Sequence, residues 1–583
     1  MKRRSFLKSV GAIAPGAIAV ATPGSAAATT TPRNQDGNDE PRVFFYDDGR
    51  HGSGLYQFEP PLIPDDLNAA VDQLVDSGVD TLFYSAGLEG GTVQYDSRVA
   101  AKWGDNVDQW NHAIFYRASR NLHQLIADGH DPMNFLAERC HQKGIFFLPT
   151  CPVGIVGGTR EADMGIGRKS DFVYDNPQFY IGKDNDPRAE NLGRFLGPNR
   201  LSFIHAEVRK ERFLIFEELL SRYETDGIEL DLSIDNEFGP LCRFQDLDQF
   251  ATLVTQFIRD LHAVARRAEK EQARRKRIYV RIPAASTTYW KALGYDVPTW
   301  VAESIVDGLV AITPHKKETR DGSILFLDQN LNLAPAVELT WETGCRVLAG
   351  LASSTGRQLA KVATPEMTWA AAALAYDSNA DGFGFCSGMW APDGWPWESE
   401  QYTTLRLLGH PDLLATADKT YLAPSQAMGA GQGGTLSDGR VLLPRTLQVG
   451  ETLKIPLRIT DDLARMSALG RVQSVRLWVR ITNYEPSLNE VEICLNGQAL
   501  PDALRIGSDQ HFRVLKNMVV GPYGFAFDYT LSPEYFPTQG NNEVNVRTVK
   551  LDPKLKAIRQ LFDVALTVTY LPHRNFQAAP IPF

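Results

Sequence analysis

The feature that most constrains the fold is an alternation of short β-rich runs with helical stretches between residues 41 and 390. Eight such runs occur, each bounded by Gly, Pro, Asp or Asn: residues 43–47, 81–85, 145–149, 228–232, 278–282, 308–312, 346–351 and 382–386. No Gly-rich phosphate loop follows the first run, which disfavours an open doubly wound sheet. Eight β-then-α units therefore predict an α/β chain that folds as a (β/α)8 TIM barrel.

The pattern changes near residue 413, where helical stretches give way to alternating strands. The strand-like runs are residues 452–458, 474–481, 490–494, 524–530, 543–550 and 564–570. They predict a C-terminal antiparallel β-sandwich of the jelly-roll type. We therefore expect a catalytic barrel at 41–413 and an accessory sandwich domain at 414–583.

The N-terminus carries Arg3 and Arg4 before Ser5-Phe6-Leu7-Lys8, a short apolar run and several small residues. This layout resembles a twin-arginine export signal, expected at residues 1–28, and a polar stretch at 29–40 is predicted to be a disordered linker. The resemblance implies export to the periplasm or the cell exterior. The apolar run is short and interrupted, so no stable membrane insertion is expected after signal cleavage.

The composition of the chain limits the classes of partner that it is expected to bind. The 583 residues carry a formal net charge of -10, which argues against a nucleic-acid partner and favours a neutral or weakly charged substrate. The six cysteines form no CxxC pair, so buried free thiols are expected rather than disulfides. No motif predicts a cofactor or a metal ion, and none indicates an oligomeric state.

The fourth β-rich run carries two carboxylates. Side chains alternate along a strand, so Ile228, Leu230 and Leu232 lie on one face, and Glu229 and Asp231 lie on the other, about 6.6 Å apart. Parallel strands of a barrel are normally apolar on both faces, so these acids indicate a site at the carboxyl end of the barrel. For Glu229, a structural ion pair with a cation on a neighbouring strand explains the residue equally well.

Cleavage of a glycosidic bond normally takes two carboxylates, about 5–5.5 Å apart in retaining enzymes and 6.5–9.5 Å apart in inverting ones. The seventh run, 346–351, contains no acid. A partner for Asp231 is therefore sought in Asp47 or Asp48, where the first run ends, or in Asp235 or Glu237, just past the fourth run. We favour Asp47 or Asp48 as the further catalytic residues.

Substrate-binding residues are expected at the same end of the barrel. Arg281, on the fifth run, is expected to pair with one of the two carboxylates and to depress its pKa. Tyr84 ends the second run, Asp235 follows the fourth and His315 follows the sixth.

Tryptophans follow the eighth run. Trp390 and Trp395 are expected to form a stacking platform for a saccharide, and a structural closure of the barrel mouth is the less favoured alternative. Two long connections, 86–111 and 151–205, also carry aromatic residues that would either stack on sugar rings or fix the loops to the barrel.

Three stretches resemble glycoside-hydrolase-like family 10 proteins: 205–231, 281–307 and 364–384. The resemblance implies a TIM-barrel glycosidase-like protein. Family 18 chitinases offer a second comparison, since they carry Asp-Gly-x-Asp-x-Asp-x-Glu at the fourth strand. Here the last position is Ser233, and a serine cannot protonate a glycosidic oxygen at neutral pH.

The sequence leaves three functions open. The first is a secreted glycoside hydrolase that cleaves a poly- or oligosaccharide with paired carboxylates. The second is a non-catalytic carbohydrate-binding protein on a TIM-barrel scaffold, suggested by Ser233 and the acid-free seventh run. The third is a metal-dependent hydrolase with ligands from among Asp47, His51, Glu229, Asp231 and His315, although no HxH spacing supports a metal site.

Overall fold

The computed structural model describes residues 40–51, 54–192, 196–234, 237–314, 327–352, 363–386, 396–424, 443–508 and 524–574. The predicted export signal lies outside these residues, and so does the predicted linker apart from Glu40. Both stay predictions. No helix in the described ranges is both long and apolar enough to cross a membrane.

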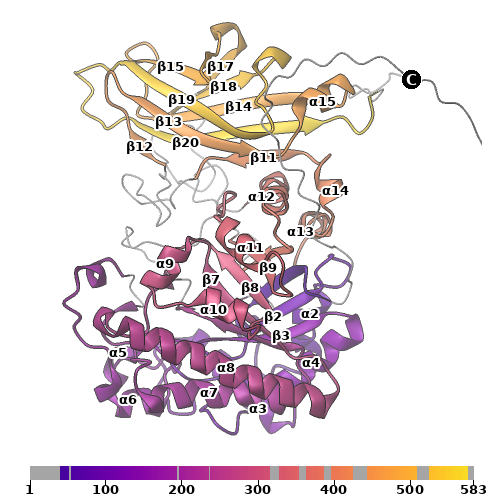
Figure 1. Ribbon diagram of the computed structural model, residues 1–583, viewed down its shortest axis with the longest axis vertical. Coiled ribbons are helices and arrows are strands. Elements are labelled where there is room, and N and C mark those ends of the chain that lie inside the picture. Colours follow the sequence, from indigo (N-terminus) through magenta and orange to yellow (C-terminus); the bar gives the residue numbers. More distant parts are fainter. Residues whose placement is uncertain are drawn as a thin grey trace, which may run out of the picture. The chain divides into compact units, whose positions relative to one another are not determined.

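Eight parallel strands close into a barrel in the order β1-β10-β9-β8-β7-β4-β3-β2 (Figure 1). Their bounds are β1 (Val43–Asp47), β2 (Thr81–Ser85), β3 (Phe146–Pro152), β4 (Gly227–Asp231), β7 (Arg277–Pro283), β8 (Gly308–Ile312), β9 (Arg346–Leu351) and β10 (Gly382–Phe385). Each strand coincides with one of the eight predicted runs to within a few residues. The predicted (β/α)8 barrel is confirmed.

Helices follow most of the strands and cover the outside of the barrel (Figure 1). Their bounds are α1 (Pro64–Leu67), α2 (Ala69–Asp72), α3 (Ala113–Ala127), α4 (Pro132–Lys143), α5 (Arg160–Asp163), α6 (Asp171–Asp175), α7 (Ala206–Ser221), α8 (Leu247–Gln272), α9 (Thr287–Ala292), α10 (Val297–Ala302), α11 (Ala334–Thr340), α12 (Pro365–Asp377), α13 (Ser399–Arg406) and α14 (Pro411–Leu414). A short hairpin, β5 (Ser233–Ile234) and β6 (Glu237–Phe238), directly follows β4.

Helix α4 shows how local sequence sets these boundaries. The side chain of Asp131 accepts a hydrogen bond from the backbone N–H of Met133, and Pro132 occupies the first turn, where its missing N–H costs nothing. At the other end Gly144 adopts φ 71°, a left-handed conformation that glycine takes without strain. This fixes where the chain enters β3.

Aromatic rings fill the interior of the barrel below its carboxyl end. The Phe44 and Phe83 rings lie 5.1 Å apart, and Phe83 lies 5.9 Å from Tyr279. Gly308 makes room for this packing, because a Cβ at that position would lie 2.2 Å from the Tyr279 ring. Since side chains alternate, the next inward positions on β1 and β7 are Tyr46 and Arg281. The barrel is closed beneath these two residues.

The C-terminal part consists of antiparallel sheets, as predicted. One follows the order β11-β20-β14-β18-β17, with β12 also paired to β20, and the other follows β13-β19-β15-β16. The bounds are β11 (Lys419–Leu422), β12 (Arg445–Thr446), β13 (Thr452–Ile459), β14 (Val472–Thr482), β15 (Glu490–Leu495), β16 (Gln498–Ala499), β17 (Arg505–Ser508), β18 (Gly524–Thr530), β19 (Gly540–Lys550) and β20 (Gln560–Tyr570), with helix α15 (Leu463–Ala468) between β13 and β14.

Helix α12 contacts the C-terminal sheets. Ala370 and Leu374 belong to the same buried apolar cluster as the inward residues of β14 and β19. Gln329 donates hydrogen bonds to the carbonyl oxygens of Met367 and Thr420, both at 2.9 Å. The predicted domain boundary at residue 413 falls within α14 and stays a prediction.

Cys140, Cys151, Cys242 and Cys386 are buried free thiols, as expected.

Candidate active site

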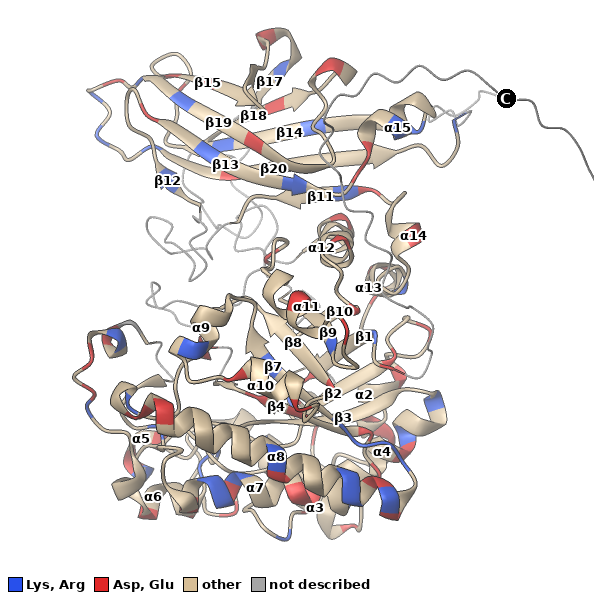
Figure 2. Ribbon diagram, in the orientation of Figure 1, with Lys and Arg blue, Asp and Glu red and all other residues tan. Residues whose placement is uncertain are grey.

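Two acids and one arginine meet at the carboxyl ends of β4 and β7, which pair in register so that Asp231 lies opposite Arg281. The Arg281 Nε and Nη2 atoms donate to the two carboxylate oxygens of Glu229, at 3.0 and 2.8 Å, and Nη1 donates to Asp231 Oδ2 at 3.1 Å. Figure 2 shows the acidic segment of β4 beside the basic segment of β7. One guanidinium therefore serves two carboxylates.

The three side chains differ in accessibility. Glu229 is 0% exposed and Arg281 is 1% exposed, whereas Asp231 retains 8% exposure. Glu229 is held at both oxygens by a fully buried cation, which matches the structural ion pair weighed from the sequence. Asp231 is the acid of this cluster that solvent, and hence a substrate, reaches.

Burial raises the pKa of Asp231 above its usual range, and the charge of Glu229 raises it further. The charge of Arg281 and the hydrogen bonds from Ser233 oppose the shift without cancelling it. Arg281 acts to lower the pKa of this carboxyl, as expected, but burial and Glu229 outweigh it and the net shift is upward. A single cation cannot neutralise two buried carboxylates, so Asp231 holds its proton to a higher pH than an ordinary aspartate.

Ser233 fixes the orientation of the Asp231 carboxyl. Its hydroxyl donates to Asp231 Oδ1 at 2.6 Å, and its backbone N–H donates to the same oxygen at 2.8 Å. Ser233 is wholly buried at the start of the β5–β6 hairpin. The serine at the position of the chitinase acid thus acts on Asp231 rather than on a substrate.

Tyr46 reaches across the barrel from β1, and the guanidinium carbon of Arg281 lies 5.0 Å from the centre of its ring. Burial raises the pKa of Tyr46, as do the charges of Asp48 and Asp231, while Arg281 and Arg50 oppose the shift. Tyr46 is therefore a neutral phenol within electrostatic reach of both acids. Tyr46 was not predicted as a site residue from the sequence, although the alternation that places Phe44 inside the barrel also places Tyr46 there.

Asp48 lies in the turn after β1 and is 7% exposed. Its Oδ1 accepts the backbone N–H groups of Arg50 and His51, both at 2.9 Å, and its Oδ2 lies 2.5 Å from His51 Nδ1 and 3.4 Å from Arg50 Nε. Burial opposes its ionisation, but the charge of Arg50 and the contacts with His51 prevail and lower the pKa of Asp48. It is an ionised carboxylate under ordinary conditions.

Asp47 and Tyr84 are register partners on β1 and β2. Because Tyr46 faces the barrel interior, Asp47 faces the opposite side, and its Oδ1 accepts the backbone N–H of Gly49 at 2.7 Å. Tyr84 is 2% exposed, and its ring lies 6.3 Å from that of Phe147. Asp47 and Tyr84 therefore support the turn after β1, and the structure does not bring them together with Glu229 and Asp231.

Glu89, in the long loop after β2, is a further carboxylate near Asp48 that the sequence analysis did not select. Burial opposes its ionisation, but the charges of Arg168 and Arg50 lower the pKa of Glu89 to about 2. Arg168 binds Glu89 Oε1 at 3.1 Å and the Tyr56 hydroxyl at 2.9 Å. Arg50 is thus shared electrostatically between Asp48 and Glu89.

The aromatic residues of the two long loops mainly hold those loops together. Trp103 is 0% exposed and donates from Nε1 to the Ile166 carbonyl at 2.8 Å. The Phe172 and Phe179 rings stack on each other at 5.9 Å. Of the two roles considered for these rings, the structure favours packing over exposed sugar stacking.

Several predicted positions lie outside the described residues: Asp235, His315, Trp390 and Trp395. Their roles stay predictions. Glu237 is described; it lies on β6, opposite Ile234, and is buried. Within the described part of the chain, no group of three or more His, Cys, Asp or Glu side chains is arranged to hold a metal ion.

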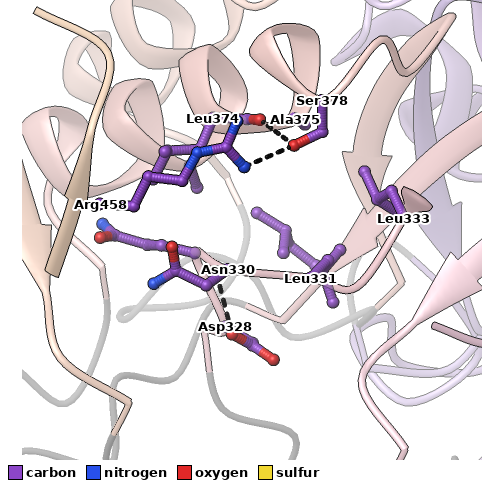
Figure 3. Close-up of a pocket in the computed structure, with 11 residues that line it drawn as sticks. Asp328, Asn330, Leu331, Leu333, Leu374, Ala375, Ser378 and Arg458 are labelled. Atoms are coloured by element: carbon purple, nitrogen blue, oxygen red, sulfur yellow. Dashed lines mark hydrogen bonds between the residues drawn. The ribbon is translucent and has the colours of Figure 1, made fainter. Parts of the chain in front are cut away.

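A pocket elsewhere in the fold is polar but very small (Figure 3). It lies among Asp328, Asn330, α12 and Arg458 of β13, and the Arg458 guanidinium donates to Ser378 Oγ at 2.9 Å. Its volume of about 10 Å³ admits about one water molecule. It cannot accommodate a sugar, so the acid cluster on β4 is the stronger candidate site.

Comparisons with known proteins give distant structural likenesses. No family model matches the sequence, and no curated protein sequence matches it. Among solved structures, a cycloisomaltooligosaccharide glucanotransferase from a Paenibacillus species is 10% identical with a TM-score of 0.35, over 90% of this chain and 57% of that one. An α-L-fucosidase from Paenibacillus thiaminolyticus is 10% identical with a TM-score of 0.38, over 65% and 50%.

A maltogenic α-amylase from Thermotoga neapolitana is 10% identical with a TM-score of 0.35, over 86% of this chain and 98% of that one. The chain thus spans 57% and 50% of the first two proteins but nearly all of the third. Likeness at this level assigns no activity. The fold rests on the chain's own strand order, and the function rests on its site residues.

Proposed function

We propose that this chain is a glycoside hydrolase that cleaves glycosidic bonds in a poly- or oligosaccharide at the carboxyl end of its barrel. Asp231 is the general acid and Asp48 is the second carboxylate. One observation carries the proposal: Arg281 binds both oxygens of Glu229 but only one oxygen of Asp231, which leaves Asp231 as the accessible acid of the cluster. The pKa values of Asp231 and Asp48 are also displaced in opposite directions. Such a pair separates the acid role from the base role.

Asp231 has the properties that a general acid needs. It keeps its proton because burial and Glu229 disfavour the charged form, and it is accessible from the mouth of the barrel. When the proton passes to the glycosidic oxygen and the C–O bond breaks, the new carboxylate is stabilised at once. Arg281 Nη1 and both donors of Ser233 already point at its oxygens.

Asp48 has the properties of the partner carboxylate, because Arg50 and His51 keep it ionised. In an inverting reaction it takes a proton from the water that attacks the anomeric carbon; in a retaining reaction it attacks that carbon itself. The configuration of the product, measured by NMR, distinguishes the two. Glu229 is assigned to structure, since both its oxygens are bound to Arg281 and it is 0% exposed, whereas Asp48 retains 7% exposure.

The proposal includes export and a family relation. Arg3 and Arg4 in their signal-like context support passage to the periplasm or exterior, which is where a polysaccharide substrate would be met. The stretches 205–231, 281–307 and 364–384 support a relation to glycoside-hydrolase-like family 10. The C-terminal sheets are proposed as an accessory module.

Release of reducing ends from a panel of neutral and acidic glycans tests the function. The wild-type protein should hydrolyse at least one glycan, and Asp231→Asn and Asp48→Asn should not. Asp260→Asn, on the exposed face of α8, is the matched control and should match the wild type. A wild-type protein that binds a glycan without cleaving it would replace the hydrolase with a carbohydrate-binding protein.

A further inference from the structure

Tyr46 stands out within its own strand. The other four residues of β1 are buried, whereas Tyr46 is partly exposed. Phe44, two positions earlier on the same face, is 0% exposed and packs against Phe83 in the closed interior. Tyr46 is therefore the point at which the packed interior of β1 gives way to the accessible mouth of the barrel.

Its hydroxyl donates a hydrogen bond to no described residue. Two buried tyrosines outside the barrel strands find acceptors: the Tyr223 hydroxyl donates to Asp131 at 2.7 Å, and the Tyr295 hydroxyl donates to the Gly239 carbonyl at 3.0 Å. The Tyr279 hydroxyl on β7 has no partner among the described residues, but Tyr279 is fully buried in the closed interior, whereas Tyr46 is partly exposed. A buried phenol usually has such a partner. The Tyr46 hydroxyl is thus available to a ligand.

The donors beside Asp231 are already in use, whereas on the Asp48 side the Arg50 Nε and Nη1 atoms are buried without a hydrogen-bond partner in the described part of the chain. Among the described residues, the Arg281 guanidinium donates three hydrogen bonds, all to Glu229 and Asp231, and the Ser233 hydroxyl donates to Asp231. A sugar in the mouth needs donors as well as acceptors, because each of its ring and hydroxyl oxygens accepts hydrogen bonds. The carboxylates supply acceptors, and Tyr46 supplies a donor between them.

The ring is held in place independently of its hydroxyl. The Arg281 guanidinium lies over the ring face at 5.0 Å, a contact that a phenylalanine would also make. The charges of Asp48 and Asp231 help to keep the phenol protonated. The hydroxyl is therefore a fixed, neutral donor.

We propose that Tyr46 is a substrate-contacting residue, whose hydroxyl donates a hydrogen bond to a sugar oxygen held between Asp231 and Asp48. This inference rests on the proposed glycoside hydrolase function and names a further residue of the same site. It also defines the ligand chemistry as an uncharged oxygen acceptor on a pyranose or furanose unit, rather than a carboxylate or sulfate, which the ionised Asp48 would repel.

The test compares Tyr46→Phe with the wild type on the glycan that the wild type cleaves best. Removing the hydroxyl should lower kcat/KM about 10- to 100-fold, the usual effect of losing one donor to substrate or transition state. The melting temperature should stay unchanged, since the hydroxyl has no partner among the described residues and the ring contact remains. Tyr116→Phe, at an exposed tyrosine of α3, is the matched control and should retain full activity.

Calorimetric binding to Asp231→Asn and to Asp231→Asn/Tyr46→Phe adds a readout that needs no turnover. The double variant should bind the glycan about tenfold more weakly. If the wild type is active but Tyr46→Phe keeps kcat/KM within about twofold, or loses activity only together with its melting temperature, the Tyr46 inference fails alone. If the wild type neither cleaves nor binds any glycan, the proposed function fails and the inference fails with it.

Discussion

Arg281 holds Glu229 through two hydrogen bonds and leaves only one for Asp231. This unequal sharing separates the roles of two acids that lie two positions apart on one strand. Both oxygens of Glu229 are hydrogen-bonded, and its side chain is inaccessible to solvent. Asp231 is partly accessible to solvent, and its raised pKa means that it retains its proton.

Glu229→Gln should destabilise the protein by roughly 1.5–3 kcal/mol, the usual cost of losing hydrogen bonds to a charged group. This loss of stability is smaller than the loss expected when a buried cation is left with no partner, because Asp231 still pairs with Arg281. Urea unfolding at neutral pH measures it. A loss of stability within about 0.5 kcal/mol of zero would show that Glu229 is not the structural partner of Arg281.

The same variant should shift the pH profile of activity. The charge of Glu229 raises the pKa of Asp231, so its removal should move the alkaline limb of kcat to lower pH. The limb is read from initial rates at saturating glycan across pH. An alkaline limb that stays in place would mean that a group other than Asp231 sets it.

Ser233→Ala should shift the alkaline limb the other way. The Ser233 hydroxyl stabilises the ionised form of Asp231, and without it the pKa of Asp231 rises further. The fall in rate should therefore begin at higher pH than in the wild type. Opposite shifts in Ser233→Ala and Glu229→Gln are a signature that general loss of folding would not produce.

Asp48→Asn should destabilise the protein in a pH-dependent way. The folded-state pKa of Asp48 is lowered, so its contribution is present above the unfolded pKa of about 3.9 and is lost as pH falls towards the lowered folded value. The difference in unfolding free energy between variant and wild type should be full at pH 7 and should shrink below about pH 4. A difference that is equal at both pH values would assign the effect to packing.

Much of the fold could be predicted because each barrel strand is bounded in the sequence by Gly, Pro, Asp or Asn residues that mark its ends. All eight barrel strands begin within one residue of the predicted run, and β1, β2, β8 and β9 match at both ends. Glu229 and Asp231 were found because carboxylates are conspicuous on an apolar strand.

The inner face of β1 was harder to predict. Both faces of a parallel strand are apolar, so the alternation of residues 43–47 separates two faces without showing which one points inward. The packing of Phe44 against Phe83 settles that question, turns Tyr46 inward and turns Asp47 away. The direction of the pKa shift of Asp231 could not be predicted from the sequence either, because it depends on how many acids share Arg281.

Export can be tested separately from chemistry. Replacing Arg3 and Arg4 together with Lys should leave a folded precursor in the cytoplasm, because the paired arginines are the recognised feature of such signals. Cell fractionation followed by immunoblotting measures the distribution. Unchanged amounts outside the cytoplasm would remove the export proposal and leave the catalytic one untouched.

The most direct test of the central claim is the rate of reducing-end release by Asp231→Asn beside the wild type at neutral pH. The substitution keeps the shape of the side chain and removes the transferable proton, so kcat should fall by about 10²–10⁴-fold, the usual contribution of a positioned acid. The melting temperature should remain close to that of the wild type, which separates lost chemistry from lost folding. Hydrolysis by Asp231→Asn at the wild-type rate would contradict the account and remove β4 from the reaction.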